Sequence, residues 1–216
     1  LTALFATVLL VSNVASTKLV VLGPFTFDGG TLLFPLAYIF GDVLTEVYGY
    51  RKSRRVIWIG FFALLLATLT FQAVAHLPAP PDAESQRFGE AFGLLLGLTP
   101  RLGLGSLLAY FLGEFANAYV LAKLKVRTEG RFFWLRALAS TLVGQGLDTG
   151  VFLLVAFYGV FPKEVLLAVF LSNYAFKLGV EALMLPFTYA VVGFLKRAEG
   201  MDAYDRDTDF NPFRLT

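Results

Sequence analysis

The stretch Tyr38–Arg55, YIFGDVLTEVYGYRKSRR, carries two acids inside an apolar run. Asp42 and Glu46 are four residues apart, so they lie on one face of a helix about one turn from each other. Acids are costly inside lipid, by about 2.5 kcal/mol or more each on insertion scales. Four basic residues follow at once, which is typical of the cytoplasmic end of a membrane span: Arg51, Lys52, Arg54 and Arg55. The stretch therefore predicts both the orientation of the chain and the location of its polar interior.

The composition is that of an integral membrane protein. Of 216 residues, 57% are hydrophobic and 16% are charged, whereas soluble domains are about 25% charged. The net charge of +2 is too small to indicate a nucleic-acid partner. The absence of cysteine excludes disulfides and thiolate metal sites, and a single histidine argues against a histidine zinc site. We expect no cofactor and no metal.

The apolar runs predict six membrane-spanning helices, because about 20 residues cross a bilayer of about 30 Å. The expected spans are residues 1–22, 31–50, 56–76, 102–124, 133–158 and 164–195. Gly23-Pro24 should end the first span and Phe27–Gly30 should form a turn. Pro186 should kink or break the sixth. Because the chain begins at Leu1 inside an apolar run, we also expect a short segment to precede it.

The prediction is an all-α integral membrane protein with one transmembrane domain, residues 1–200, and a cytoplasmic tail, residues 201–216. Residues 86–98 are too short to span and should form an amphipathic or re-entrant segment between the third and fourth helices. Lys and Arg are unevenly distributed, with twelve in one set of loops and tail and three in the other. This bias predicts that both termini are cytoplasmic.

Polar residues recur at helical spacing inside four spans. The pairs and the triplet have spacings of three or four residues, so each set occupies one helix face, and the four faces should point inward around a polar cavity. We expect substrate to be bound by Asp42, Glu114, Asn117, Gln145, Asp148, Asn173 and Lys177, and a gating or structural role for Glu46 and Glu181.

Simpler interpretations exist for individual residues. A lone polar side chain can join helices, at about 0.6 kcal/mol on average. Lys177 and Glu181 could form a structural ion pair, and Glu46 could pair with Arg51 at a helix end. Taken together, however, Lys177 compensates only part of the acidic charge, so some acid must hold a proton or await a ligand that donates hydrogen bonds.

The expected side chains suit a small, flat, polar heterocycle. Carboxylates accept hydrogen bonds, Asn and Gln both donate and accept, and Phe and Tyr offer stacking faces. A lactam N–H beside an exocyclic amino group, as on a guanine-like edge, could bind one carboxylate through two parallel hydrogen bonds. Glu114 and Asp148 lie near the middle of their spans and are the best-placed acids. Lys177 could donate to the carbonyl oxygen.

Three motifs resemble those of the queuosine precursor transporters, a group within the vitamin uptake transporters. They are Phe40–Arg51 (FGDVLTEVYGYR), Ser172–Lys177 (SNYAFK) and the tail Tyr204–Phe213 (YDRDTDFNPF). The resemblance covers nearly the whole chain and departs from the family at the start, where the leading Met and cytoplasmic residues are absent. The tail could dock on the cytoplasmic loops through local turns at Asp205–Thr208 and Asn211-Pro212, or form a gate contact.

The resemblance implies six helices in a bacterial inner membrane and a protein that is not an enzyme. It implies uptake of 7-cyano-7-deazaguanine, and of the 7-aminomethyl form as a second candidate, for salvage into queuosine. The alternative is the substrate-binding subunit of an energy-coupling-factor importer for another vitamin or nucleobase. A membrane enzyme is disfavoured by the lack of Cys and of a nucleophile or metal cluster, and a purely structural protein by the polar faces. The partners expected are a deazaguanine and the lipid bilayer, and the oligomeric state, including a homodimer, stays open.

Overall fold

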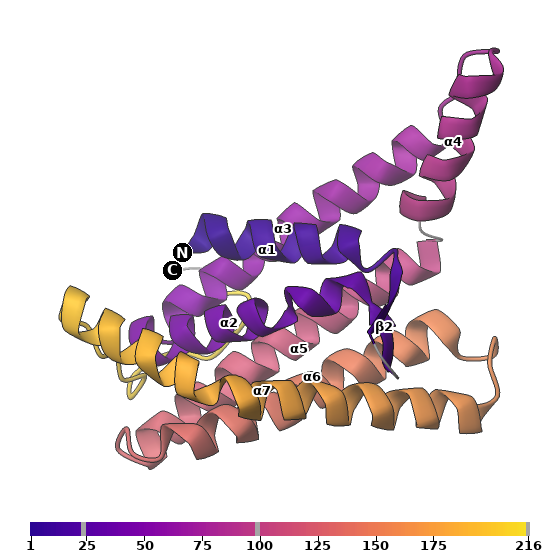
Figure 1. Cartoon of the computed structure of the whole chain (residues 1–216). Coiled ribbons are helices and arrows are strands. Elements are labelled where there is room, and N and C mark those ends of the chain that lie inside the picture. Colours follow the sequence, from indigo (N-terminus) through magenta and orange to yellow (C-terminus); the bar gives the residue numbers. More distant parts are fainter. Residues whose placement is uncertain (23–24, 98–99, 215–216) are drawn as a thin grey trace.

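The computed structural model of the chain describes residues 1–22, 25–97 and 100–214 and is almost entirely helical (Figure 1). The helices are α1 (Thr2–Ala15), α2 (Phe34–Tyr48), α3 (Tyr50–Ala75), α4 (Ala83–Leu96), α5 (Pro100–Arg127), α6 (Phe133–Phe157) and α7 (Lys163–Glu199). Between α1 and α2 lie an antiparallel hairpin, β1 (Leu19–Leu22) with β2 (Phe25–Asp28), and a 3-10 turn, η1 (Gly29–Leu32).

Four helices, α3, α5, α6 and α7, are long and apolar enough to cross a membrane. They match the third to sixth predicted spans, so a helical fold with candidate membrane spans is confirmed. The helices at the first two predicted spans are shorter. α1 has 14 residues and α2 has 15, which gives about 21–23 Å at 1.5 Å per residue. Six full crossings therefore stay a prediction.

The extent predicted for the first span is wrong. α1 ends at Ala15 instead of continuing to residue 22. The Ser16 and Thr17 hydroxyls donate to backbone carbonyls one turn back, at 2.9 and 2.8 Å, and such bonds compete with helix continuation. The next residues, LVVL, contain β-branched valines that favour a strand. Residues 27–28, predicted as a turn, belong to β2. The predicted end at Gly23-Pro24 lies outside the described residues.

Two further boundaries differ from the prediction. α7 is one 37-residue helix that passes through Pro186. Of the two predicted outcomes, a kink or a break, there is no break, and the helix changes direction between its orange and yellow parts (Figure 1). The basic residues after Tyr50 lie in the first turns of α3 and not in a loop. Gly49 alone joins α2 to α3, with φ of 82°, a conformation that favours glycine.

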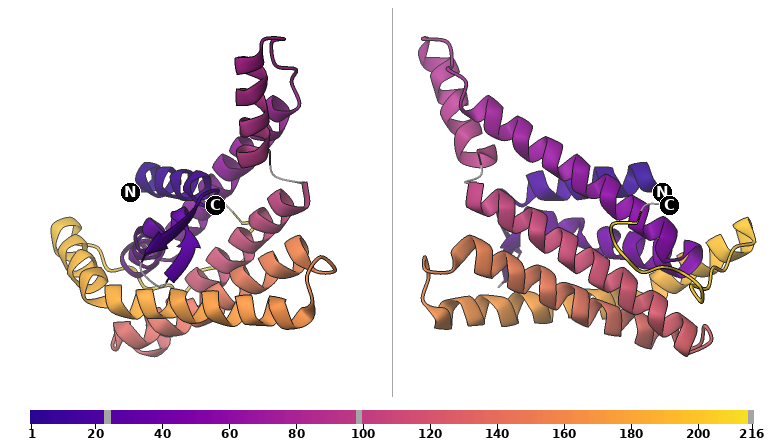
Figure 2. Two further views of the ribbon diagram at one scale, coloured as in Figure 1. Left: turned by 45° about the vertical axis from the view of Figure 1, so that its right-hand side comes forward. Right: turned by 180° about the vertical axis from the view of Figure 1, so that it is seen from behind.

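A short helix between the third and fourth predicted spans is confirmed. α4 begins after Asp82, whose carboxylate accepts the Ser85 N–H at 2.8 Å and caps the helix. The helix folds back against the far end of α3, where Phe92 lies beside Phe71, and projects with it from the rest of the bundle (Figures 1 and 2). None of its residues is buried. With 14 residues it is too short to span.

The central helix is α2, which packs against α1, α3, α5 and α7. Its side chains from Val43 to Val47 are all buried. The long helices and α1 and α2 run alternately in opposite directions, and the N- and C-termini lie at the same end (Figures 1 and 2). That end also holds the α2–α3 junction, the α5–α6 loop and the end of α7. We call it the basic end, because it carries the basic clusters at residues 51–55, 123–131 and 196–197.

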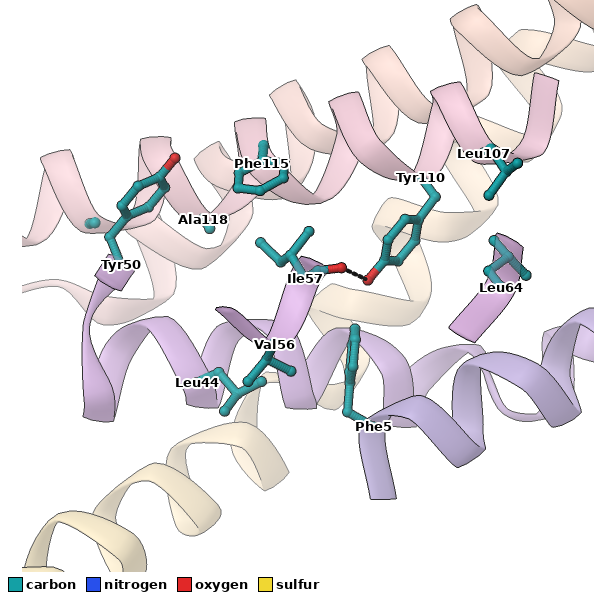
Figure 3. Close-up of a cluster of buried hydrophobic side chains, with 11 residues drawn as sticks. Phe5, Leu44, Tyr50, Val56, Ile57, Leu64, Leu107, Tyr110, Phe115 and Ala118 are labelled. Carbon is teal, nitrogen blue, oxygen red and sulfur yellow. Dashed lines mark hydrogen bonds between the residues drawn. The ribbon is translucent and has the colours of Figure 1, made fainter. Parts of the chain in front are cut away.

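An apolar cluster joins α1, α2, α3 and α5 on one side of the bundle (Figure 3). Phe5, Leu44 and Ile57 lie in it, together with Tyr110, whose hydroxyl donates to the Ile57 carbonyl at 3.1 Å. On the other side, α5 crosses α6 at two glycines. A Cβ on Gly113 would lie 2.8 Å from Asp148 Cβ, and one on Gly144 would lie 2.8 Å from Asn117 Cβ. Glycine at these two positions therefore allows the backbones to approach, as is common between membrane helices.

Candidate functional site

A cavity of about 360 Å³ lies among α1, α5, α6 and α7. Its volume is within the range of about 300–1,000 Å³ that is usual for small-molecule sites. Three of the predicted binding residues line it, Asp148, Asn173 and Lys177. Its other polar lining residues are Ser12, Asn13, Ser16, Ser106 and Thr149, and its aromatic lining residues are Tyr110, Phe152 and Phe157.

Lys177 is the central polar group of this cavity. Its ammonium forms an ion pair with Asp148 at 2.8 Å and donates to Gln145 Oε1 at 3.0 Å and to Thr149 Oγ1 at 3.3 Å. These three partners are all on α6. The side chains of Lys177 and Asp148 keep 17% and 30% of their surface exposed, so a ligand in the cavity can reach both. The predicted local ion pair of Lys177 with Glu181 is not the contact found, because the ammonium points across to α6.

Tyr110 is fixed between the cavity and the apolar cluster. Its hydroxyl is held by the Ile57 carbonyl (Figure 3), and Gly60, one turn further along α3, leaves room for it. A Cβ on Gly60 would collide with that hydroxyl. The ring is therefore a rigid wall of the cavity, as suits a flat ligand.

The remaining predicted acids of the spans do not line this cavity. Asn117 donates to Asp42 Oδ1 at 3.3 Å, and Thr141 donates to Glu181 Oε1 at 2.5 Å. The Asp42 and Glu181 carboxyl groups lie within hydrogen-bonding reach of each other. Glu114 lies where the charges of Asp148 and Glu181 act on it. These residues form a polar layer next to the cavity, in which Asp42, Thr141 and Glu181 are buried and Glu114 and Asn117 are partly buried.

Glu46 belongs to a separate group near the basic end, which we call the Glu46 ion cluster: Glu46, Lys125, Arg136, Lys196 and Asp202. The Arg136 guanidinium donates to both Glu46 oxygens, at 2.7 and 3.2 Å. Lys196 contacts Glu46 at 2.7 Å and Lys125 contacts it at 3.6 Å. Both lysines also pair with Asp202. The suggested Glu46–Arg51 pair is therefore wrong, because Glu46 faces the bundle interior whereas Arg51 is exposed.

The tail after α7 docks on the start of α3. Asp205 accepts the Tyr50 N–H at 2.9 Å and the Thr208 hydroxyl at 2.7 Å. Arg54 donates to the carbonyls of Asp209 and Asn211, at 2.9 and 2.7 Å. These contacts show the docked arrangement, with the expected local bond between Asp205 and Thr208.

Asp202 links the tail to the ion cluster. Partial burial alone would raise the pKa of its carboxyl, but hydrogen bonds and charge from Lys125 and Lys196 outweigh burial and hold the pKa below its usual value. A carboxyl with a lowered folded pKa stabilises the fold above its unfolded pKa, about 3.9, and loses that contribution as pH falls through the folded value. Asp202 therefore keeps its ion pairs with Lys125 and Lys196 throughout the neutral pH range.

Most of the polar positions were predicted from the sequence, but several of their partners were not. Asp148, Asn173, Lys177 and Gln145 come together as expected, whereas Asp42, Glu114 and Asn117 form the adjoining layer. The α1 polar face at Ser12–Ser16 and the cations of the ion cluster were missed. Arg136 could have been found, because a guanidinium inside an apolar run needs an acidic partner.

Residues 28–191 match the family model described as "Putative vitamin uptake transporter". The match covers the second predicted span, the polar layer and the cavity residues of α5, α6 and α7. The chain belongs to the vitamin uptake transporter family.

Among curated members of this family, the "Probable queuosine precursor transporter" of Bacillus subtilis (strain 168) is 36% identical over 86% of this chain and 80% of its own length. The "Queuosine precursor transporter" of Escherichia coli (strain K12) is 26% identical over 76% of this chain and 71% of its own. A relative from Haemophilus influenzae is 25% identical over 76% of this chain and 67% of its own. The comparison with solved structures found no significant match. The family and its helices make this chain a multi-pass membrane transporter, not an enzyme.

Proposed function

We propose that this chain imports queuosine precursors, 7-cyano-7-deazaguanine in the first place, across the bacterial inner membrane. The observation that carries the proposal is the cavity with Asp148 and Lys177 at its centre, in a chain whose relatives are named for this transport. The 7-aminomethyl form, which carries a cationic arm, is the second substrate to test.

The cavity chemistry matches one edge of a deazaguanine. The Asp148 carboxylate can accept the lactam N–H and the 2-amino group together, and Lys177 can donate to the adjacent carbonyl. Asn173 can read the remaining edge, and the Tyr110 and Phe152 rings offer stacking faces. Gln145 and Thr149 would hold the Lys177 ammonium in place while Asp148 turns to the ligand.

Three residues of the polar layer would form the path beyond the cavity. Asp42, Glu114 and Asn117 lie deeper than the cavity lining, between it and the Glu46 ion cluster. A substrate that leaves the cavity toward the basic end would meet these three groups next. We assign Asp42, Glu114 and Asn117 to the substrate path. We propose that the Glu46 ion cluster closes this path at the basic end.

The orientation follows from where the cavity and the basic end lie. The cavity is lined by the later part of α1, the first part of α5, the later part of α6 and the first part of α7, which are the parts distant from the basic end. With the basic end in the cytoplasm, six crossings place both termini inside, residues 1–200 in the membrane and the tail from residue 201 in the cytoplasm. The cavity then faces outward.

The test is uptake by cells that cannot make queuosine precursors. Cells expressing the chain receive 7-cyano-7-deazaguanine, and queuosine in tRNA is measured. We expect restoration by the wild type and by Glu84→Gln, an exposed acid on α4, and loss with Asp148→Asn or Lys177→Met at equal membrane expression. Restoration by both cavity variants would refute the assigned site, and no restoration by the wild type would refute the substrate.

Reconstitution of the purified chain alone separates the importer-subunit alternative from this proposal. Liposomes that contain only this chain should exchange internal for external substrate. If exchange requires an added ATPase module, the chain is a binding subunit and not a transporter in its own right.

A further inference from the structure

We propose that the Asp42–Glu181 carboxyl pair binds one proton, which enters the cell together with each substrate molecule. The inference rests on the proposed function and adds its driving force. The two acids come from different helices, α2 and α7, and meet inside the bundle.

Both acids are removed from solvent, with 3% of Asp42 and 5% of Glu181 exposed. They lie on two helices that pack against each other, with their carboxyl groups close enough to share a hydrogen bond. Two ionised carboxylates at such a distance repel each other and cannot donate to each other, so an adjacent pair holds a single proton. That proton turns the repulsion into a hydrogen bond between α2 and α7.

The donors around the pair leave one place for this proton. Asn117 donates to Asp42 Oδ1, and Thr141 donates to Glu181 Oε1. Within the described chain, Glu181 Oε2 is buried without a hydrogen-bond partner, a costly state for a carboxylate oxygen. A proton on Asp42 would donate to this oxygen. Only an O–H bond forms or breaks in the step.

The charges that face the pair supply no substitute for a proton. Glu114 on α5, Asp148 on α6 and Glu46 on α2 are all acidic. Lys177, on the neighbouring turn of α7, pairs with Asp148. The remaining nearby cations, Lys125, Arg136 and Lys196, converge on Glu46, and the two lysines also pair with Asp202.

The position of the pair couples the proton to the substrate. Lys177 is one helical turn before Glu181, so the cavity cation and the proton site lie on one face of α7. Loss of the proton would leave two adjacent negative charges that push α2 and α7 apart. Proton occupancy therefore biases the helix contact that positions the cavity lysine, which is the two-state element that coupling requires.

The experiment uses the purified full chain in liposomes with 7-cyano-7-deazaguanine and an internal pH-sensitive dye. With an acidic exterior, we expect the wild type to accumulate substrate above its external concentration, and a protonophore to abolish this. With equal pH on both sides, added substrate should acidify the interior. Substrate exchange without either pH response would overturn the proton proposal and leave the proposed function standing.

Glu181→Gln is the decisive variant, because its amide can donate to Asp42 in place of the proton but cannot titrate. We expect it to keep substrate exchange and to lose both gradient-driven accumulation and the acidification signal. Glu90→Gln, an exposed acid on α4, should behave as wild type. Accumulation by Glu181→Gln would overturn the proposal. If this variant does not fold, the wild-type dye measurement still decides. Absence of exchange by the wild type would instead overturn the proposed function, and this inference with it.

Discussion

At the scale of single residues, Glu46 shows how a membrane protein can retain several charges in its interior. One carboxylate is paired with cations on three helices: it accepts hydrogen bonds from Arg136 on α6 and Lys196 on α7, and Lys125 on α5 forms a longer ion pair with it, at 3.6 Å. Burying ions is expensive, but removing one partner of a buried group costs more, about 3–5 kcal/mol, because the others lose compensation. Glu46 is therefore the residue that holds α5, α6 and α7 together at the basic end.

Glu46→Ala should lower the melting temperature of the purified protein by roughly 10 °C or more, since a destabilisation of this size shifts a chain of this length by a few degrees per kcal/mol. Arg51→Ala, which removes an exposed charge from the next helix, is the matched control and should melt as wild type. Thermal unfolding in detergent measures both. Equal melting temperatures of Glu46→Ala and Arg51→Ala would contradict the role assigned to Glu46.

At the scale of helices, α5 and α6 are joined by close backbone contact. Each of the glycines at their crossing faces the backbone of the other helix and a polar side chain that the site needs, Asp148 at Gly113 and Asn117 at Gly144. The packing of the helix pair and the position of the cavity acid are therefore set by the same crossing.

Gly113→Ala should push α6 outward at Asp148 and reduce both stability and uptake, with an overpacking cost of about 1–3 kcal/mol. Gly193→Ala adds the same methyl group on α7, where a Cβ meets no atom within 4 Å. This control should keep uptake and gain slight stability from helix propensity. Uptake and melting measured on both variants test the idea, and wild-type behaviour of Gly113→Ala would refute close packing there.

The start of α3 is an element completed from elsewhere in the chain. Gly49 has no side chain to cap the helix, and Asp205 of the tail accepts the first N–H instead. A carboxylate at a helix N-terminus also interacts favourably with the helix dipole. The tail thus acts as the helix cap, although about 150 residues of chain separate the two.

Asp205→Ala should destabilise the protein by about 0.5–2 kcal/mol, the usual cost of a lost cap. The tail should also loosen, which Trp58 can report because its indole N–H donates to the Pro212 carbonyl at 2.8 Å. A red-shifted Trp58 emission in a Trp134→Phe background is the readout. Asp207→Ala, an exposed neighbour, should change neither value, and an unshifted emission in Asp205→Ala would rule out the cap.

At the scale of the whole molecule, some of the basic residues that predict the orientation also hold the fold together. Arg54 and Lys125, which count toward the topological bias, are buried and bind the tail and the ion cluster. Their side chains therefore stabilise the fold in addition to contributing to the predicted orientation. The bias still predicts that the basic end is cytoplasmic.

Single introduced cysteines can test this orientation without background labelling, because the chain has no cysteine of its own. Ala83→Cys lies at the start of α4 and Ala198→Cys near the end of α7, and both positions are exposed. In intact cells a membrane-impermeant maleimide should label Ala83→Cys and not Ala198→Cys, which should react only after permeabilisation. The reverse labelling pattern would show that the basic end lies outside the cell.

The sequence predicted the class of fold and the polar faces well, because hydropathy and helical spacing are local properties. It could not predict which faces meet. Glu46 and Asp42 share one face of α2, yet Glu46 binds Arg136 and Asp42 approaches Glu181, and these pairings depend on the depth and rotation of helices that lie about 90 and 140 residues away. The end of α1 was missed because side-chain bonds to the backbone, not hydropathy, set it.

The docked tail also has a consequence for biosynthesis. Residues 201–214 leave the ribosome after all seven helices, so the first turn of α3 stays uncapped, and the buried Arg54 guanidinium lacks its carbonyl acceptors, until translation has passed Asn211. A chain truncated before that point keeps every apolar segment needed for membrane insertion and lacks the contacts that close the basic end. Insertion and completion of the fold are thus separate events, and a truncated chain differs from the full one by its unsealed basic end.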